Sequence, residues 1–336
     1  GEWVGGPMYF IKNGLGEKFH FVGVLFASFA GLAAFGIGNM TQANTISNSV
    51  TSAFILFAPI MEGHEETISL GVGVLLSALV GLVLIGGIQR IGSITEKLVP
   101  GMALLYILGC LIVIISNIGS VGTVLLSIVQ GAFNPTSAVG GVVGITLTEA
   151  IKRGVGRGVF SNEAGLGSAS IAHAAAQTDS PVKQGLFGVF EVFADTIVIC
   201  TLTALTILCS GTEITYGVGA GSDLTMAAFA VTFGGQLASV IIALGISLFA
   251  FTTILSWGFY GSRSIAFLFG DKWIKPYQTV FVLFIVVGAT MELSLAWDIA
   301  DTLNGLMAIP NLIGLLLLSG TVFKLTKGHF TKQKES

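Results

Sequence analysis

Charge is scarce in this 336-residue sequence. Asp, Glu, Lys and Arg make up 10% of it, whereas a soluble globular domain carries roughly a quarter. Hydrophobic residues reach 53%, and several apolar runs exceed the ~18 residues typical of a spanning helix. The composition excludes an ordinary soluble domain and predicts an all-α polytopic membrane protein.

Cysteine is also rare. Cys110, Cys200 and Cys209 all lie in apolar runs and show no metal-ligand spacing. They exclude a disulfide framework and are expected to be small buried residues. The sequence also lacks an initial Met and a signal peptide, so we expect an N-terminally truncated fragment.

Hydropathy predicts eight crossings, joined in two places by connections (119–134 and 211–234) that are too short or too polar to span. The expected crossings are 20–55, 67–89, 98–118, 138–178, 184–210, 235–262, 274–296 and 302–323. The whole chain, 1–336, is expected to be one transporter domain with a basic tail at 324–336.

Basic residues predict the orientation. With eight crossings, twelve of the 15 lie on one side, and the opposite connections hold only acidic residues such as Glu65. By the positive-inside rule, both chain ends are expected in the cytoplasm. The exceptions are Lys152, Arg153 and Arg157. Splitting 138–178 into two crossings would place them inside but would put the lysine tail outside, so one interrupted crossing fits better.

That interrupted crossing carries the sequence "GRGVFSNEAGLGSASIAHAAA" (156–176). Irregular backbone persists in a membrane only where it is buried in protein or lines a cavity, and broken helices are typical of transporter binding sites. Ser161, Asn162 and Glu163 at the same depth favour a binding site. The alternative is a glycine kink for helix packing, in which Glu163 neutralises a nearby arginine.

Two further stretches are candidates. In "FGIGNMTQANTISNS" (35–49), Gln42 offers a donor and an acceptor, which suits a zwitterion; such amides also join helices. In "FAFTTILSWGFYG" (249–261), the Thr252 and Thr253 hydroxyls and the Phe249 carbonyl could bind a small cation, although Thr commonly bonds its own helix. Trp257, one turn further, is a candidate pocket wall.

Acidic residues inside the membrane are functional candidates by default. Glu191 and Asp195 are four residues apart on the fifth expected crossing. Together with Glu163 they are a possible coupling or gating network, and a structural network with Ser or Thr is equally open. His173 is expected to be a packed, hydrogen-bonded residue.

Several motifs together resemble the alanine or glycine:cation symporter family, and the likeness runs through essentially the whole chain. They are "GGPMYFIKNGLG" (5–16), "GIGNMTQANTI" (36–46), "RGVFSNEAGLGSASIAHAAA" (157–176), "FADTIVICTLTAL" (193–205) and "FTTILSWGFYG" (251–261). The resemblance implies a prokaryotic inner-membrane carrier that imports alanine or glycine with Na⁺ or H⁺. It also implies the LeuT-type inverted-repeat fold, here with core helices 3–10 present and 1–2 missing.

The resemblance further implies roles for particular residues. Residues 160–165, including Phe160, Ser161, Asn162 and Gly165, would form an unwound hinge at the substrate. Gln42 would reach the substrate, and Trp257 would wall its side-chain pocket. Phe249, Thr252 and Thr253 would form half of a sodium site. Na⁺ is the expected coupling ion, with no other cofactor; the lipid bilayer is an expected partner and nucleic acid is not.

Other functions are weaker. A channel would need a ring of recurring polar residues, and none recurs. The enzyme alternative is an intramembrane protease. A serine protease would need a third catalytic partner for Ser168 and His173, and the sequence offers none. A zinc protease would need a second His in "HEETI" (64–68), and this His is missing. Another sodium-coupled small-solute carrier of the same fold is the remaining alternative.

Overall fold

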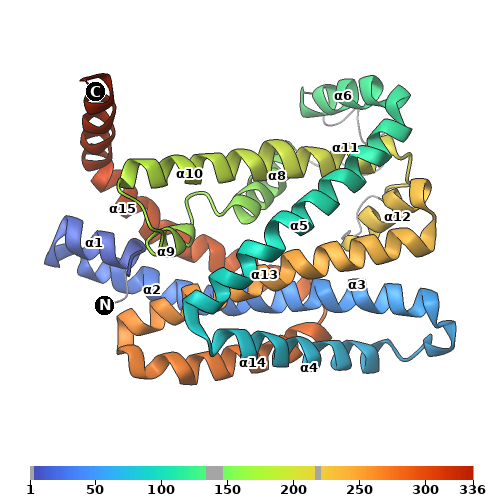
Figure 1. The fold of residues 1–336 in the computed structure, drawn as a ribbon, viewed down its shortest axis with the longest axis horizontal. Helices are drawn as coiled ribbons and strands as arrows, with labels where there is room; N and C mark the ends of the chain where they lie inside the picture. The colour runs from blue at the N-terminus through green and yellow to red at the C-terminus, as the bar shows by residue number, and fades with distance from the viewer. Residues whose placement is uncertain (1–3, 134–146, 216–220, 336) are drawn as a thin grey trace.

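The computed structural model describes residues 4–133, 147–215 and 221–335, and these residues form helices and turns without strands. The elements, in chain order, are α1 (Pro7–Leu15), α2 (His20–Phe35), α3 (Thr41–Phe57), α4 (Glu65–Leu84), α5 (Gly87–Ser116), α6 (Ile118–Phe133), α8 (Leu147–Asn162), α9 (Ala169–His173), α10 (Pro181–Phe193), α11 (Thr201–Cys209), α12 (Ser222–Phe233), α13 (Gly235–Phe269), α14 (Ile274–Thr290) and α15 (Leu293–Glu335). Figure 1 shows most of the long helices along one axis, with α5 running obliquely across them.

Seven of the described helices or helix runs are long and apolar enough to cross a membrane: Glu17–Phe57, Glu65–Leu84, Gln89–Ser116, Pro181–Cys209, Gly235–Phe269, Asp271–Thr290 and Trp297–Thr331. They correspond to seven of the eight expected crossings. The eighth, 138–178, begins outside the described residues, and its described part consists of the short helices α8 and α9, which are not among the seven.

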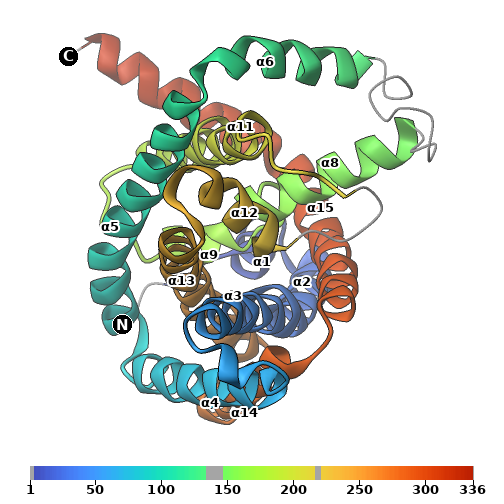
Figure 2. The same ribbon diagram turned by 90° about the vertical axis from the view of Figure 1, so that its right-hand side faces the viewer.

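The two expected connections are short helices in the structure, α6 and α12. Figure 2 looks along α3 and α13, and α6 runs across that direction at the edge of the bundle. A helix in that orientation suits a segment that lies at the surface rather than one that spans, as the hydropathy of 119–134 predicted.

The apolar core lies where α2, α3, α13 and α14 meet. Glycines allow close approach there: a Cβ on Gly38 would lie 1.9 Å from the Cβ of Trp257, and one on Gly288 would lie 2.5 Å from the Cα of Met40. Asn44 donates a hydrogen bond to the carbonyl of Met291 at 2.6 Å, which ties α3 to the end of α14. Without a hydrophobic force between helices in lipid, small residues and such polar contacts hold membrane helices together.

The polar stretch 35–49 does not interrupt its helix. Gly36–Met40 form a π-helical turn, and the chain continues without a gap from α2 into α3. All five residues of this turn are buried. The wider turn shifts the helix register by one residue, and the close contact of Gly38 with Trp257 fills the space beside it.

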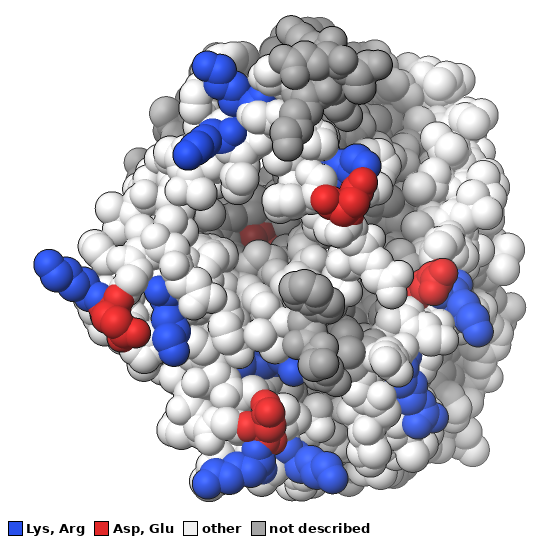
Figure 3. Space-filling view, turned by 60° about the vertical axis from the view of Figure 1, so that its left-hand side comes forward, with Lys and Arg blue, Asp and Glu red and all other residues white. Residues whose placement is uncertain are grey.

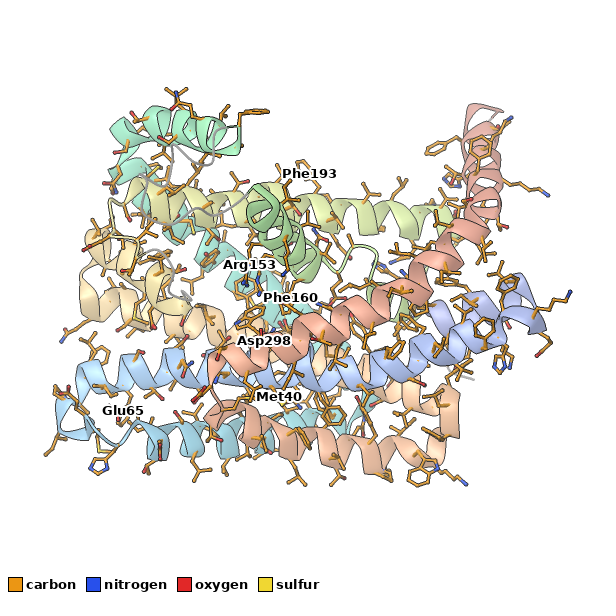
Figure 4. All side chains as sticks on the ribbon, turned by 180° about the vertical axis from the view of Figure 1, so that it is seen from behind. Met40, Glu65, Arg153, Phe160, Phe193 and Asp298 are labelled. Carbon is orange, nitrogen blue, oxygen red and sulfur yellow. The ribbon has the colours of Figure 1, made fainter. Side chains whose placement is uncertain are left out.

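The two ends of the bundle differ in charge. Figure 3 shows basic side chains around the end that carries α1, and Figure 4 shows Glu65 at the opposite end of the molecule from α1 and the C-terminal part of α15. α15 continues as one helix to Glu335, so the described part of the expected tail extends this helix.

Candidate functional site

The helix break in the motif 156–176 is present. α8 ends at Asn162, α9 begins at Ala169, and the residues between them are not helical. Glu163 has φ 55°, a left-handed conformation that is uncommon outside glycine. The side-chain Oδ1 of Asn162 accepts a hydrogen bond from the backbone N–H of Ala164 at 2.9 Å, which closes a local turn at the helix end.

The expected hinge at 160–165 is therefore displaced toward the C-terminus. Phe160, Ser161 and Asn162 complete α8, and the unwound segment is 163–168. The physical reason is that the left-handed residues come late in the motif: Gly165 has φ 80° and Gly167 has φ 90°. Glycine adopts this conformation at no steric cost, so the chain leaves the helix there and not at Phe160.

Contacts with α15 and α1, and a hydrogen bond within the break itself, hold it in place. Asn311 of α15 donates a hydrogen bond to the carbonyl of Gly165 at 2.8 Å. Ser168, which is fully buried, donates one to the Glu163 carboxylate at 2.6 Å. A Cβ on Gly167 would lie 2.5 Å from Pro7. The break is thus a fixed structure supported by hydrogen bonds and close contacts.

The break lines a cavity of about 820 Å³. Asn162 faces it from the end of α8, Glu163 and Gly165 face it from the break, and Glu191 faces it from α10. The cavity extends to residues 179–181 beside Lys183, at the basic end of the bundle, where Figure 3 shows a hollow in the surface. The ammonium group of Lys183 donates a hydrogen bond to Asp179 at 2.8 Å and holds the pKa of that carboxyl below its ordinary value.

A second polar group joins the end of α8 to the π-helix Ala194–Cys200 between α10 and α11. Ser161 donates a hydrogen bond to the Asp195 carboxylate at 2.7 Å, and Asn162 donates one to the hydroxyl of Thr196 at 3.1 Å. A carboxylate and hydroxyl oxygens beside the carbonyl end of a helix are chemically suited to a small cation.

The three expected acidic residues bond to different side chains, and two of them, Glu163 and Glu191, line the same cavity. Asp195 accepts a hydrogen bond from Ser161. Glu191 is hydrogen-bonded to His173, with 3.1 Å between its Oε2 atom and the Nε2 atom of the imidazole. His173 also contacts Gln184 at 2.6 Å. The prediction that His173 is a hydrogen-bonded residue is confirmed, and its partners tie α9 to α10.

The threonines predicted to bind sodium bond to their own helix. Thr252 donates a hydrogen bond to the Phe249 carbonyl at 2.9 Å, and Thr253 donates one to the same carbonyl at 3.0 Å. The three expected oxygen ligands are therefore adjacent, as the spacing required. This arrangement is also the local bonding that the sequence left open, so their role as sodium ligands stays a prediction.

The other expected substrate residues are not brought to the cavity. Gln42 donates a hydrogen bond to the Ile37 carbonyl at 3.1 Å, and Trp257 is fully buried with its Cβ against Gly38. The Trp257 side chain lies close to Glu163, which connects α13 to the break. Phe160 packs on Trp297, with 4.7 Å between ring centroids, and so faces α15.

Two residues that support the break were missed by sequence reasoning. Ser168 was considered only as a protease nucleophile, although its place between two small residues after the glycines fits a helix start. Asn311 follows Pro310 inside α15. An amide directly after a proline in a spanning helix was a usable signal, because both residues disturb regular helix bonding.

Comparison with known proteins settles the family. The model of the sodium:alanine symporter family matches residues 1–336. The chain belongs to the sodium:alanine symporter family. The match covers the whole chain.

Several curated relatives are similar over nearly the entire chain. A sodium/alanine symporter, AgcS, of Methanococcus maripaludis is 44% identical over 97% of this chain and 69% of its own length. An uncharacterized transporter of Haemophilus influenzae is 41% identical over 99% of this chain and 70% of its own. A probable sodium/glutamine symporter, GlnT, of Bacillus subtilis is 40% identical over 99% of this chain and 66% of its own.

Proposed function

We propose that this protein is a secondary active symporter that imports alanine or glycine together with Na⁺. The observation that carries the proposal is the break at 163–168, whose polar groups line a large cavity inside a bundle of spanning helices. Free backbone groups at such a break bind the charged ends of a small zwitterion. The similarity to the sodium/alanine symporter AgcS supports the choice of substrate and ion.

The fold proposed for this function is the LeuT-type inverted repeat, in which α8 and α9 together form one broken core helix. In such folds one group of helices rocks against another around a fixed site near the middle of the membrane. The packed core of α2, α3, α13 and α14 would be the rigid part. The break, which contacts α15 through Asn311, would be a moving part.

Each group of polar residues has a proposed role. The amino acid would be contacted by the expected substrate residues, which are Gln42, Phe160, Ser161, Asn162, Gly165 and Trp257. The Phe249 carbonyl, Thr252 and Thr253 would coordinate sodium. Glu163, Glu191 and Asp195 would couple ion and substrate movement. Gln42 and Trp257 do not line the cavity beside the break, so substrate binding in this proposal moves the break toward α3 and α13.

Uptake of labelled alanine into proteoliposomes containing the full chain tests the function. An imposed Na⁺ gradient should drive accumulation, and excess glycine should compete. Glutamine, the substrate named for GlnT, should compete weakly; strong competition would move the substrate class toward larger side chains.

In Thr252→Val or Thr253→Val the half-saturating Na⁺ concentration should rise, because one oxygen ligand is removed with little change in shape. Accumulation without any Na⁺ dependence would refute sodium coupling.

We further propose that the protein lies in a prokaryotic inner membrane with its C-terminus in the cytoplasm. The ring of basic residues at the α1 end and the acidic Glu65 at the other end support this orientation. A single cysteine at Lys327 should react with an impermeant reagent only after cells are opened, and one at Glu65 should react in intact cells. Reaction of both in intact cells would overturn the orientation.

A further inference from the structure

A second cavity, of about 510 Å³, lies between α8 and the first turns of α15. It contains the three basic residues that the positive-inside rule left on the wrong side. α14 begins beside Lys272 and Lys275 at the basic end, and α15 begins where α14 finishes. The start of α15 is therefore displaced toward the acidic end. Figure 4 shows Arg153, Phe160 and Asp298 grouped in the middle of the molecule, away from the C-terminal end of α15.

The walls of this cavity carry opposite charges. Lys152, Arg153 and Arg157 come from α8, and Asp298 and Asp301 come from α15. Among the described residues, basic side chains thus line one wall and acidic side chains the other. A zwitterionic amino acid matches such a site because its carboxylate and its ammonium group can face opposite walls.

Arg157 and Asp301 already form one direct link across the cavity. The two guanidinium nitrogens lie 3.3 and 3.0 Å from the two carboxylate oxygens. The guanidinium also lies over the ring of Trp297, with 4.0 Å between its central carbon and the ring centroid. Since Trp297 packs on Phe160, this link connects the cavity to the helix end that leads into the break.

Asn304 supplies an independent indication of a ligand. Its side chain lines the same cavity and is 8% exposed. Within the described part of the chain, its Oδ1 atom has no hydrogen-bond partner. A buried amide oxygen without a partner costs free energy, and it is an acceptor of the kind that an ammonium group requires.

We propose that this cavity is an outer entry site for zwitterionic amino acids. The α-carboxylate binds between Lys152 and Arg153, and the ammonium group binds Asp298 and the Oδ1 atom of Asn304. The basic wall on α8 anchors the carboxylate, and the proximity of Lys152 and Arg153 disfavours cationic amino acids and free Na⁺. The site rests on the proposed transport function, and it assigns a role to basic residues that the central site does not use.

The site predicts a directional effect, because an outer entry site is used by substrate arriving from outside. Right-side-out and inverted membrane vesicles containing the full chain provide the two directions. In Lys152→Gln and in Asn304→Leu the KM for alanine entering from the outer face should rise about five-fold, the loss expected for one partly exposed charged or polar contact. The KM from the inner face and the maximal rate should stay within a factor of about two.

Lys97→Gln is the matched control, since it removes one lysine charge from an exposed position on α5 far along the chain from this cavity. It should leave both KM values unchanged. If Asn304→Leu does not fold, Lys152→Gln at its exposed position carries the test alone. Equal rises of KM in both directions, or no rise from the outer face, would overturn the entry site while transport itself persists. Loss of Na⁺-driven alanine uptake in the unsubstituted protein would instead refute the transport function.

Discussion

The π-helical turn Gly36–Met40 and the break at 163–168 look alike in sequence, but the structure uses them differently. Each combines glycines with polar residues inside an apolar run. The first stays helical and fully buried, whereas the second interrupts the helix and lines a cavity. Glycine and amide content therefore marks irregular backbone in a membrane helix, and neighbouring residues decide whether the irregularity serves packing or binding.

In the π-helical turn, the polar groups and the glycine are used for helix contacts. The side chain of Trp257 of α13 packs against Gly38, and Asn39 donates a hydrogen bond to the Phe281 carbonyl of α14. Gly288 of α14 lies against the backbone of Met40. These contacts leave little room for a small molecule, and they make the turn a junction of three helices.

At the break, the polar groups satisfy the backbone without closing the space around it. Asn311 reaches the Gly165 carbonyl from α15, and Ser168 reaches Glu163 from the start of α9. The left-handed residues turn the chain away from α8. What remains is open volume lined by groups that can form further hydrogen bonds, as a binding site requires.

Sequence reasoning predicted the helix content, the break and the two surface connections, because hydropathy and glycine placement act locally. It placed the break three residues early, since the position of Gly165 depends on contacts with Asn311 and Leu312 of α15. It also expected Phe160 and Trp257 to face one pocket. Their partners, Trp297 and Gly38, lie in distant parts of the chain, and no local pattern identifies such pairs.

The largest effect is expected where packing is tightest, at Gly38. In Gly38→Ala the added Cβ would lie 1.9 Å from the Cβ of Trp257, so α3 and α13 must separate. Overpacking of this kind costs about 3 kcal/mol or more. The thermal unfolding midpoint in detergent should fall sharply, or the variant should not be recovered folded.

Gly71→Ala is the matched control, because nothing lies within 4 Å of a Cβ on Gly71 in α4. Its unfolding midpoint should equal that of the unsubstituted protein. A Gly38→Ala protein of unchanged stability would break the comparison, since it would show that the π-helical turn yields readily and could itself rearrange during transport.

A smaller effect, on stability as well as on transport, is expected at the break. Ser168→Ala removes the hydrogen bond to the Glu163 carboxylate, and a hydrogen bond to a charged group is worth about 1.5–3 kcal/mol. Because that bond fixes the Glu163 side chain inside the unwound segment, we expect the initial rate of alanine uptake to fall about ten-fold, as the loss of such a bond implies.

Ser170→Ala is the control, because it removes a hydroxyl that bonds only to the Gly167 carbonyl in the adjoining turn. It should retain at least half the rate. Equal uptake rates in Ser168→Ala and Ser170→Ala would mean that the hydrogen bond to Glu163 has no role in transport. The break would then resemble Gly36–Met40, with its polar side chains serving packing alone.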